Sequence, residues 1–355
     1  MRKVALVVAA AVFAPSVASA QTVAPLQAPN ATAAGTTGFA VHPGLEVFAQ
    51  YALRLTNTDA GVQTDNVFDV PRVHASVAAT YENVRARVVL EAVRSASEGS
   101  LLGVAGDSLI LRVREAWGGW SSPRVDVRAG VVPTLTVPEI ESAWGLRAVA
   151  TSSQEATRMM APADLGLTAR MALPRGLGAV AVGVFNGEGY AQREFNRSKN
   201  VEGMVLLRPA PGAALEPLVF LASAVFGSSG AGDSQANRAT GAALWRGTRI
   251  RAGLTFTWAW GVDDRGDRNG WIAEGFVAAE PVQRLLLGAR VLRWQHDTGV
   301  DADHFTNVVV TAGWRVFRPW EVYLAGTRQI VGSAALQATP ASDFWDLRAV
   351  SRVVF

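Results

Sequence analysis

The sequence predicts an all-β fold, a transmembrane antiparallel up-and-down β-barrel of about 16 strands. Three observations predict this class: hydrophobicity without a long apolar run, segments whose two faces alternate, and connections that alternate between short and long. Hydrophobic residues make up 49% of the 355 residues and the mean hydropathy is +0.17. After residue 20, however, no run approaches the roughly 18 apolar residues of a membrane helix. Lipid-facing strands that alternate with inward polar residues produce this combination.

The segment 249–260 shows the alternation. Leu254 and Phe256 fall on one face, whereas Arg251 and Thr255 fall on the other, because successive side chains of a strand point to opposite sides. A charged residue on the lipid face costs about 2–4 kcal/mol near the bilayer midplane. The charged face therefore turns toward a lumen.

The spacing of such segments predicts the order of the barrel. The expected strands are 45–56, 68–81, 84–94, 109–121, 125–133, 165–174, 178–187, 200–210, 215–227, 237–246, 249–260, 270–280, 283–296, 304–318, 320–330 and 343–355. Tight connections alternate with longer ones at 57–67, 95–108, 134–164, 188–199, 228–236, 261–269, 297–303 and 331–342. Short periplasmic turns and long extracellular loops give this pattern. About 16 strands enclose an aqueous channel.

The two ends of the chain carry export signals. Residues 1–20 have a charged start, an apolar stretch and a small-residue cleavage site, as in a signal peptide. Residues 21–43 are expected to be a flexible leader, and residues 44–355 the barrel. The chain has no cysteine, which excludes disulfides and thiol catalysis. The terminal Phe355 resembles the last residue of outer-membrane barrels, which serves as an assembly signal.

Arginine supplies nearly all the cations, because Lys3 and Lys199 are the only lysines. The guanidinium fork suits phosphate and carboxylate, although a GC-rich genome gives the same bias. Alternation turns the following residues inward as the predicted anion path: Arg54, Arg72, Arg85, Arg87, Arg112, Arg114, Arg128, Arg170, Arg249, Arg251, Arg348 and Arg352, with Arg208, Arg246, Arg290 and Arg315 on the same face. The alternative is that these arginines pair with inward carboxylates and only hold the wall.

The connection 134–164 is the longest. As the third long loop, it is expected to fold inward and narrow the channel, and the alternative is an outward loop over a neighbouring subunit. The residues expected to line the constriction are Glu139, Glu141, Arg147, Glu155 and Arg158.

Residues 160–211 resemble the phosphate-selective porin O/P family of outer-membrane porins. The matching pieces are Ala161-Pro162-Ala163-Asp164-Leu165-Gly166, Gly183-Val184-Phe185-Asn186-Gly187-Glu188-Gly189 and Leu207-Arg208-Pro209, with Asn196, Lys199 and Gly203 at the family's spacing. Arg114-Glu115-Ala116-Trp117 and Gly130-Val131-Val132-Pro133 resemble the preceding strands. The resemblance implies a pore, and phosphate as one candidate solute. The lysine-rich loops of the family are missing here.

Other chemistry has little support in the sequence. His296 and His304 stand among aspartates, but their spacing matches no metal site, and a solvated loop is expected. Ser76 lies two positions from His74 without a third orienting group for hydrolysis. No metal, cofactor or nucleic-acid partner is expected. Glu115 falls on the apparent lipid side, where only a bulge or a subunit contact accounts for it.

The predicted function is a Gram-negative outer-membrane porin for passive diffusion of small anions, and not an enzyme. The alternatives are a barrel hydrolase acting on lipid or peptide, and a plugged structural or adhesive barrel. The expected partners are outer-membrane lipid, small anions and the assembly machinery, with the choice between monomer and homotrimer open.

Deletion of Phe355 is expected to lower the amount of inserted barrel far more than it alters the conductance of barrels that do insert. The reason is that the last strand must both be recognised and close the barrel, since an unclosed edge is an aggregation template. Quantifying the protein in isolated outer membranes tests this. A normal level of the truncated protein contradicts it.

Overall fold

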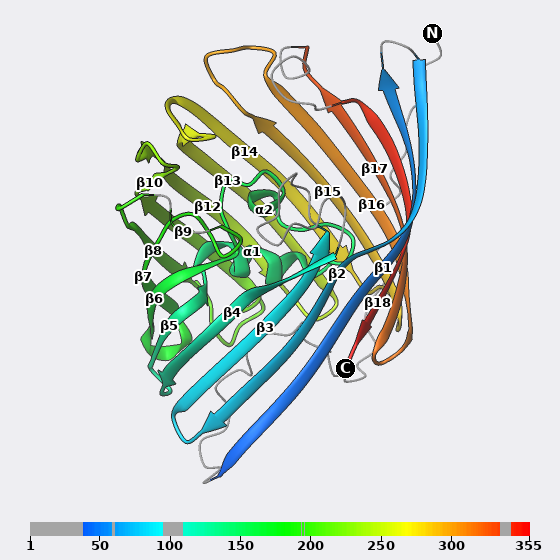
Figure 1. Ribbon diagram of the computed structural model, residues 1–355. Coiled ribbons are helices and arrows are strands. Elements are labelled where there is room, and N and C mark those ends of the chain that lie inside the picture. The colour runs from blue at the N-terminus through cyan, green and yellow to red at the C-terminus, as the bar shows by residue number, and fades with distance from the viewer. Residues whose placement is uncertain (1–37, 59–60, 95–108, 193, 195, 334–341) are drawn as a thin grey trace.

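The computed structural model describes residues 38–58, 61–94, 109–192, 194, 196–333 and 342–355. Within them, sixteen strands form one closed barrel in which β1 pairs with β18 (Figure 1). The predicted fold class is confirmed. The predicted signal peptide and most of the predicted leader lie outside the described residues.

The strands follow the predicted order. They are β1 (Phe39–Thr58), β2 (Gly61–Tyr81), β3 (Val84–Arg94), β4 (Leu109–Ser121), β5 (Val125–Pro133), β6 (Ala163–Ala172), β7 (Gly178–Phe185), β8 (Asn200–Leu207), β9 (Leu218–Phe226), β12 (Asn237–Arg246), β13 (Ile250–Val262), β14 (Arg265–Ala279), β15 (Leu285–Gln295), β16 (His304–Phe317), β17 (Trp320–Val331) and β18 (Phe344–Val354). A small hairpin, β10 (Ser228–Ser229) with β11 (Ser234–Gln235), decorates one loop.

The helical elements are few and short. They are α1 (Thr136–Trp144), α2 (Ser153–Ala156) and the 3-10 turn η1 (Pro174–Gly176). No helix in the described part of the chain is long and apolar enough to cross a membrane.

Two connections expected to be long are short, because their flanking strands continue past the apolar belt. β1 and β2 remain paired from Thr56 with Gln63 to Thr58 with Gly61, and β13 and β14 are joined only by Asp263 and Asp264. The residues of these extensions are mostly polar, so the hydrophobic alternation ends while the backbone hydrogen bonds continue. β1 likewise begins at residue 39, inside the expected leader.

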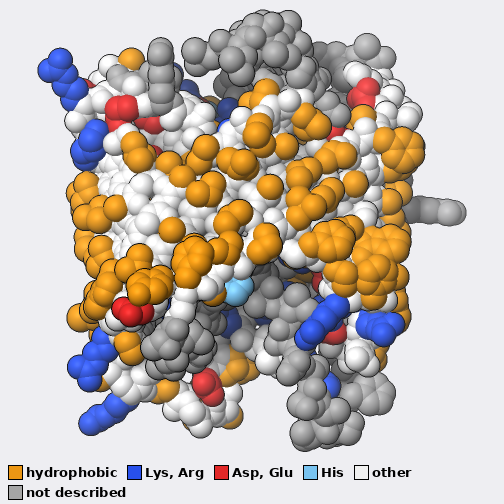
Figure 2. All heavy atoms as spheres, turned by 60° about the horizontal axis from the view of Figure 1, so that its bottom comes forward, with side chains coloured by type: hydrophobic (Ala, Val, Ile, Leu, Met, Phe, Trp, Pro, Cys, Tyr) orange, Lys and Arg blue, Asp and Glu red, His pale blue; other side chains and the backbone are white. Residues whose placement is uncertain are grey.

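The outer wall carries the expected apolar belt. Leu254 and Phe256 are 69% and 46% exposed on β13, whereas Thr255 and Thr257 between and beside them are buried on the inner face. Figure 2 shows hydrophobic side chains around the wall, with charged side chains mainly beyond its edges. The aromatic side chain of Tyr323 on β17 is 5% exposed and faces the lumen, where its hydroxyl donates to Glu321.

Glu115 also faces the lumen, because β4 contains a bulge. The pairing of β4 with β3 shifts by one residue at Arg114, so both Arg114 and Glu115 turn inward. Glu115 accepts a hydrogen bond from Trp117 Nε1 at 3.1 Å and lies 3.6 Å from Arg87 Nε. The bulge therefore accounts for the charge that alternation placed on the lipid side, and it also turns Trp117 toward the lumen, where it is 6% exposed.

His296 ties two loops together at the loop end of the barrel. Its Nδ1 lies 2.8 Å from Asp303 Oδ2, its Nε2 contacts Asp263, and the side chain is buried rather than solvated as expected. Arg268 also reaches Asp263, at 3.1 Å, and lies 3.6 Å from Asp297. Burial lowers the pKa of His296, but the bonds to Asp263 and Asp303 outweigh burial and hold the pKa above its ordinary value.

We expect the contact between the turn at 263–264 and the loop at 296–303 to depend on pH. A raised folded-state pKa means that the stabilisation is complete below the unfolded value of about 6.5 and is lost as pH rises through the folded value. Amide exchange in both segments should accelerate over that range in the wild type. His296→Gln should remove the step, whereas His304→Gln should keep it, and a step that survives in His296→Gln contradicts the assignment.

Candidate functional site

The connection between β5 and β6, residues 134–162 and here called loop 3, lies inside the barrel (Figure 1). Its buried side chains include Ile140, Trp144 and Leu146, which pack on Leu244 and Phe276 of the inner wall. The rings of Trp144 and Phe276 lie 5.6 Å apart at 66°. This apolar contact fixes one side of loop 3 to the wall and leaves its charged side toward the opposite strands.

A carboxylate of the wall holds the start of α1. Leu135, the residue before the helix, offers no side-chain cap. Instead, Glu202 of β8 accepts hydrogen bonds from Leu135 N at 2.9 Å, Thr136 N at 2.9 Å and Thr136 Oγ1 at 2.6 Å. The free N–H groups at a helix start need such acceptors. Further along loop 3, Ser153 Oγ donates to Glu274 Oε2 at 2.8 Å.

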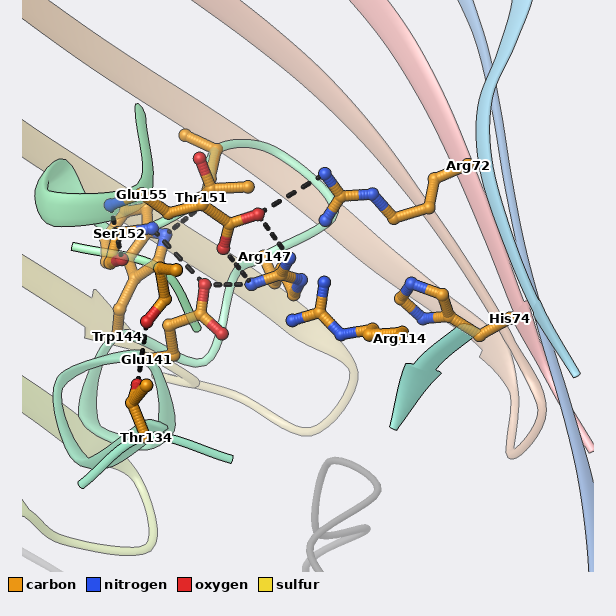
Figure 3. A network of polar contacts seen from close by, with 12 residues as sticks. Arg72, His74, Arg114, Thr134, Glu141, Trp144, Arg147, Thr151, Ser152 and Glu155 are labelled. Carbon is orange, nitrogen blue, oxygen red and sulfur yellow. Dashed lines mark hydrogen bonds and ion pairs between the residues drawn. The ribbon is translucent and has the colours of Figure 1, made fainter. Parts of the chain in front are cut away.

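The charged edge of loop 3 carries Glu141, Arg147 and Glu155, which are largely buried (Figure 3). Arg147 binds Glu155 through both terminal nitrogens, at 2.7 and 2.8 Å, and also contacts Glu141. From the wall, Arg72 Nη2 reaches Glu155 Oε1 at 3.5 Å. Loop 3 and the arginine-bearing wall thus meet through an ion pair.

The two carboxyl groups of this edge differ in their proton affinity. Burial raises the pKa of Glu141. Burial also acts to raise the pKa of Glu155, but Arg147 and Arg114 outweigh it and hold the pKa below its ordinary range. Glu155 is therefore the stronger acid of the two.

On the opposing wall, three arginines share one carboxylate. Glu91 of β3 is fully buried. It lies 3.1 Å from Arg72 Nε, 2.7 Å from Arg112 Nη2 and 3.3 Å from Arg114 Nη1. His74 Nε2 lies 3.1 Å from the same carboxylate. One negative charge cannot neutralise three guanidinium groups, so this wall keeps an excess of positive charge toward loop 3.

Tyr190 completes the cluster and was not identified from the sequence. Its hydroxyl donates to Glu91 Oε2 at 2.8 Å and accepts from Arg112 Nη2 at 2.8 Å. Its ring lies 4.8 Å from the guanidinium carbon of Arg112. Gly187 and Gly189 before it have φ of 114° and 78°. These glycines indicate a sharp turn, but nothing local indicates that the turn delivers Tyr190 to strands β3 and β4.

A second group joins loop 3 to the wall near the tight-turn end. Glu139 of α1 lies 2.6 Å from Arg170 and 2.7 Å from Arg246. Burial raises the pKa of Glu139, but the two guanidinium groups outweigh it and hold the pKa low. Arg251 packs against Gly145, the left-handed residue that ends α1, where a Cβ atom would overlap its guanidinium group.

The structure separates the other predicted arginines into three groups. Arg54 and Arg348 share Asp346, Arg352 pairs with Glu46 and Glu321, and Arg128 pairs with Asp126. Arg85 and Arg87 face the lumen on β3 by register. Arg249 and Arg208, expected on the wall of the lumen, are instead exposed in tight connections. Arg158, expected to line the constriction, is exposed in loop 3.

The hydrolase alternative gains no geometry from the wall. Both ring nitrogens of His74 face carboxylates, at 3.3 Å from Glu46 and 3.1 Å from Glu91, and Ser76 Oγ lies 3.5 Å from the carbonyl oxygen of Gly44. Among the described residues, no group of three or more His, Asp or Glu side chains is arranged to hold a metal ion.

Several solved structures have a fold similar to this barrel, and one of them is a porin. The anion-selective porin from Comamonas acidovorans has a TM-score of 0.60 at 12% identity, over 90% of this chain and 100% of that chain. OmpF of Salmonella typhi in complex with daunomycin has 0.66 at 10% identity, over 89% and 97%. Outer-membrane expressed OmpT of Vibrio cholerae has 0.59 at 11% identity, over 91% and 99%. No family model matches the sequence, and neither does any curated protein.

These similarities agree with the barrel fold of the structure, and this fold indicates a membrane-spanning protein. A closed antiparallel barrel with an apolar outer belt is the β-architecture that can span a membrane, because it leaves no unpaired strand edge. The protein is a closed, sixteen-stranded antiparallel β-barrel of the membrane-spanning kind, and its fold is similar to that of solved outer-membrane proteins.

Removing the acceptor at Glu202 is expected to loosen loop 3. Glu202→Ala leaves the buried amides of Leu135 and Thr136 without a partner, which costs about 1–3 kcal/mol per group. The temperature at which the folded barrel unfolds in detergent should fall, and the single-channel current should become noisier. Glu216→Gln, an exposed carboxylate in the β8–β9 connection, is the control. Unchanged stability and noise in Glu202→Ala contradict the anchoring role.

Proposed function

We propose that the protein is an outer-membrane channel through which small hydrophilic anions diffuse passively. The observation that carries the proposal is the charge where loop 3 meets the wall. Four guanidinium groups gather there with three carboxylates, which are Arg72, Arg112, Arg114 and Arg147 with Glu91, Glu141 and Glu155. Counted as ionised groups, these side chains leave one net positive charge at this place.

A narrow polar passage between low-dielectric walls strengthens the effect of such an excess on a passing ion. Rings of arginine or lysine are a known means of anion selection in pores. The solved porin from Comamonas acidovorans, whose fold this chain shares, is described as anion-selective, and this supports the same direction of selectivity here.

The solutes that suit this wall are small phosphates and carboxylates. The side chains of Arg72 and Arg112 are 19% and 28% exposed and keep part of their donor sets toward the lumen. A guanidinium fork matches two oxygens of either anion. The resemblance of residues 160–211 to phosphate-selective porins supports phosphate among these solutes.

Most of the other inward arginines serve the wall. Arg54 and Arg348 share Asp346, and Arg352 lies between Glu46 and Glu321. Together, these three guanidinium groups face three carboxylates, so the group as a whole contributes little net charge. The selectivity of the proposed channel therefore depends on the cluster at loop 3 more than on the full set of inward arginines.

A bilayer recording with unequal KCl concentrations tests the proposal. The wild type should show steady ohmic steps and a reversal potential that favours chloride. Arg112→Gln should lower the chloride-to-potassium permeability ratio by about twofold, because a unit charge about 8 Å away in water is worth about 0.5 kcal/mol. The preference should fade toward 1 M salt, where the Debye length is about 3 Å.

Arg112 is the residue to change because it is the most exposed of the three arginines on Glu91, and two partners remain for that carboxylate. Arg265→Gln, an exposed arginine at the loop end paired with Asp267, is the matched control and should leave the ratio unchanged. A wild type without conductance favours the plugged barrel. A wild-type channel that prefers potassium contradicts the proposed anion selectivity. So does an equal effect of Arg112→Gln and Arg265→Gln on the permeability ratio.

A further inference from the structure

Six exposed arginines surround the end of the barrel where the tight connections lie, here called the turn rim. They are Arg124, Arg175, Arg208, Arg249, Arg284 and Arg318, each in a different connection between neighbouring barrel strands. Figure 2, which brings this end forward, shows Lys and Arg side chains standing out beyond the apolar belt. The porin function uses none of them, since they lie outside the strand wall of the lumen.

The backbone places these arginines rigidly. The carbonyl oxygens of Arg124, Arg249 and Arg284 accept hydrogen bonds from Ala172 N, Glu280 N and Arg315 N at 2.7 to 2.8 Å. Arg208 N donates to Leu177 O at 2.8 Å. The bonds of Arg249 and Arg208 join one tight connection to the next one around the barrel, and those of Arg124 and Arg284 join a tight connection to the neighbouring strand β6 or β16. The backbone at these four arginines is therefore held in place around the barrel end, and their exposed side chains extend from it.

Each rim arginine lies next to the edge of the apolar belt. Leu177, Leu207, Ile250, Val282 and Phe317 are 41–58% exposed and lie within two residues of Arg175, Arg208, Arg249, Arg284 and Arg318, respectively. Trp120, 47% exposed, lies at the end of β4 just before the turn that carries Arg124. Long cationic side chains beside an apolar surface extend to the polar boundary of the bilayer. The rim arginines therefore reach the headgroup level.

The charge of the rim is positive. Its exposed carboxylates are Glu82 and Glu216, while Glu280 is engaged by Arg315 at 3.0 Å. Among the described residues, no carboxylate forms an ion pair with the guanidinium groups of Arg124, Arg175, Arg208, Arg249 or Arg284, although Arg284 N donates to Glu280 Oε1 at 3.0 Å. Because the arginines are spread over six connections, they cannot all meet a partner that binds on one side. The fitting partner is one that surrounds the barrel.

We propose that the turn rim binds anionic phospholipid headgroups of the leaflet that meets the tight-turn end of the barrel. In outer-membrane barrels the short turns face the periplasm, so this is the phospholipid leaflet on that side. A guanidinium group donates two parallel hydrogen bonds to phosphate oxygens, which the ammonium group of lysine cannot do. The ring thereby anchors the depth of the barrel. This proposal is independent of which ions pass through the lumen.

The test uses the full-length protein in nanodiscs of phosphatidylcholine alone and in nanodiscs that also contain phosphatidylglycerol. Phosphatidylglycerol should raise the unfolding temperature of the wild type, and native mass spectrometry should show it retained in preference to phosphatidylcholine. The variant Arg124→Gln, Arg175→Gln, Arg208→Gln should lose retention by about fivefold for each arginine, the ratio that corresponds to about 1 kcal/mol. Its conductance should equal that of the wild type.

The control removes equal charge from the loop end, with Arg197→Gln, Lys199→Gln and Arg265→Gln, and should keep the lipid preference. Arg→Lys at the three rim positions keeps the charge and should give intermediate retention. If the glutamine variant does not insert, the test uses the lysine variant and the salt dependence of phosphatidylglycerol retention by the wild type. Retention should then be weaker in the lysine variant and should fall as salt rises. Equal retention of both lipids by the wild type overturns the proposal. So does a preference that the rim substitutions leave intact, or binding of acidic cell-wall fragments without any lipid preference.

Discussion

Every backbone N–H and C=O group within the bilayer must find its partner in the chain itself, since lipid offers none. The pairing of β1 with β18 meets this requirement for the two strands that would otherwise be edges. It extends from Glu46 opposite Val354 to Thr56 opposite Phe344, and Leu45 and Phe355 exchange hydrogen bonds at 3.1 and 2.8 Å. Closure also assigns each strand residue to the lipid or to the lumen, and the rest of the structure follows from that division.

The inner face must then hold many arginines at low solvent exposure. A buried guanidinium group loses hydration and needs carboxylates and further acceptors. The wall provides them by sharing, as where Asp346 serves both Arg54 and Arg348. Glu91 serves Arg72, Arg112 and Arg114 together. Sharing stabilises the arginines while leaving net positive charge, so structural support and an electrostatic field come from the same residues.

Loop 3 has an apolar side and a charged side, which serve different purposes in the lumen. The apolar side packs against the inner wall. This packing requires hydrophobic residues on both surfaces and also room on the wall for the side chains of loop 3. Gly288 provides such space, because a Cβ atom there would lie 2.4 Å from Leu146 Cδ1. The other side carries Arg147 with Glu141 and Glu155 toward the arginine wall. The apolar side holds loop 3 in position, and the charged side determines what the remaining passage attracts.

The sequence by itself determined the class of fold, because alternation with a period of two and the spacing of turns are local properties. It also determined which residues face inward along regular strands, as for Arg72, Arg112 and Arg352. Prediction from the sequence failed where the strand pairing does not follow the local pattern of apolar and polar residues. The bulge at Arg114 reversed the expected side of Glu115, and the polar extensions of β1 and β2 continued beyond the apolar pattern.

Only the tertiary structure decided which charges meet. Tyr190 and Glu91 are 99 positions apart, and Glu202 lies 66 positions from the helix start that it holds. Such pairs depend on how the closed barrel and loop 3 bring distant segments together, which no local periodicity encodes. The same closure placed Arg249 on the turn rim and Arg251, two residues away, against Gly145 in the lumen. Alternation gave both residues the same face, but only the point at which β13 begins separated their roles.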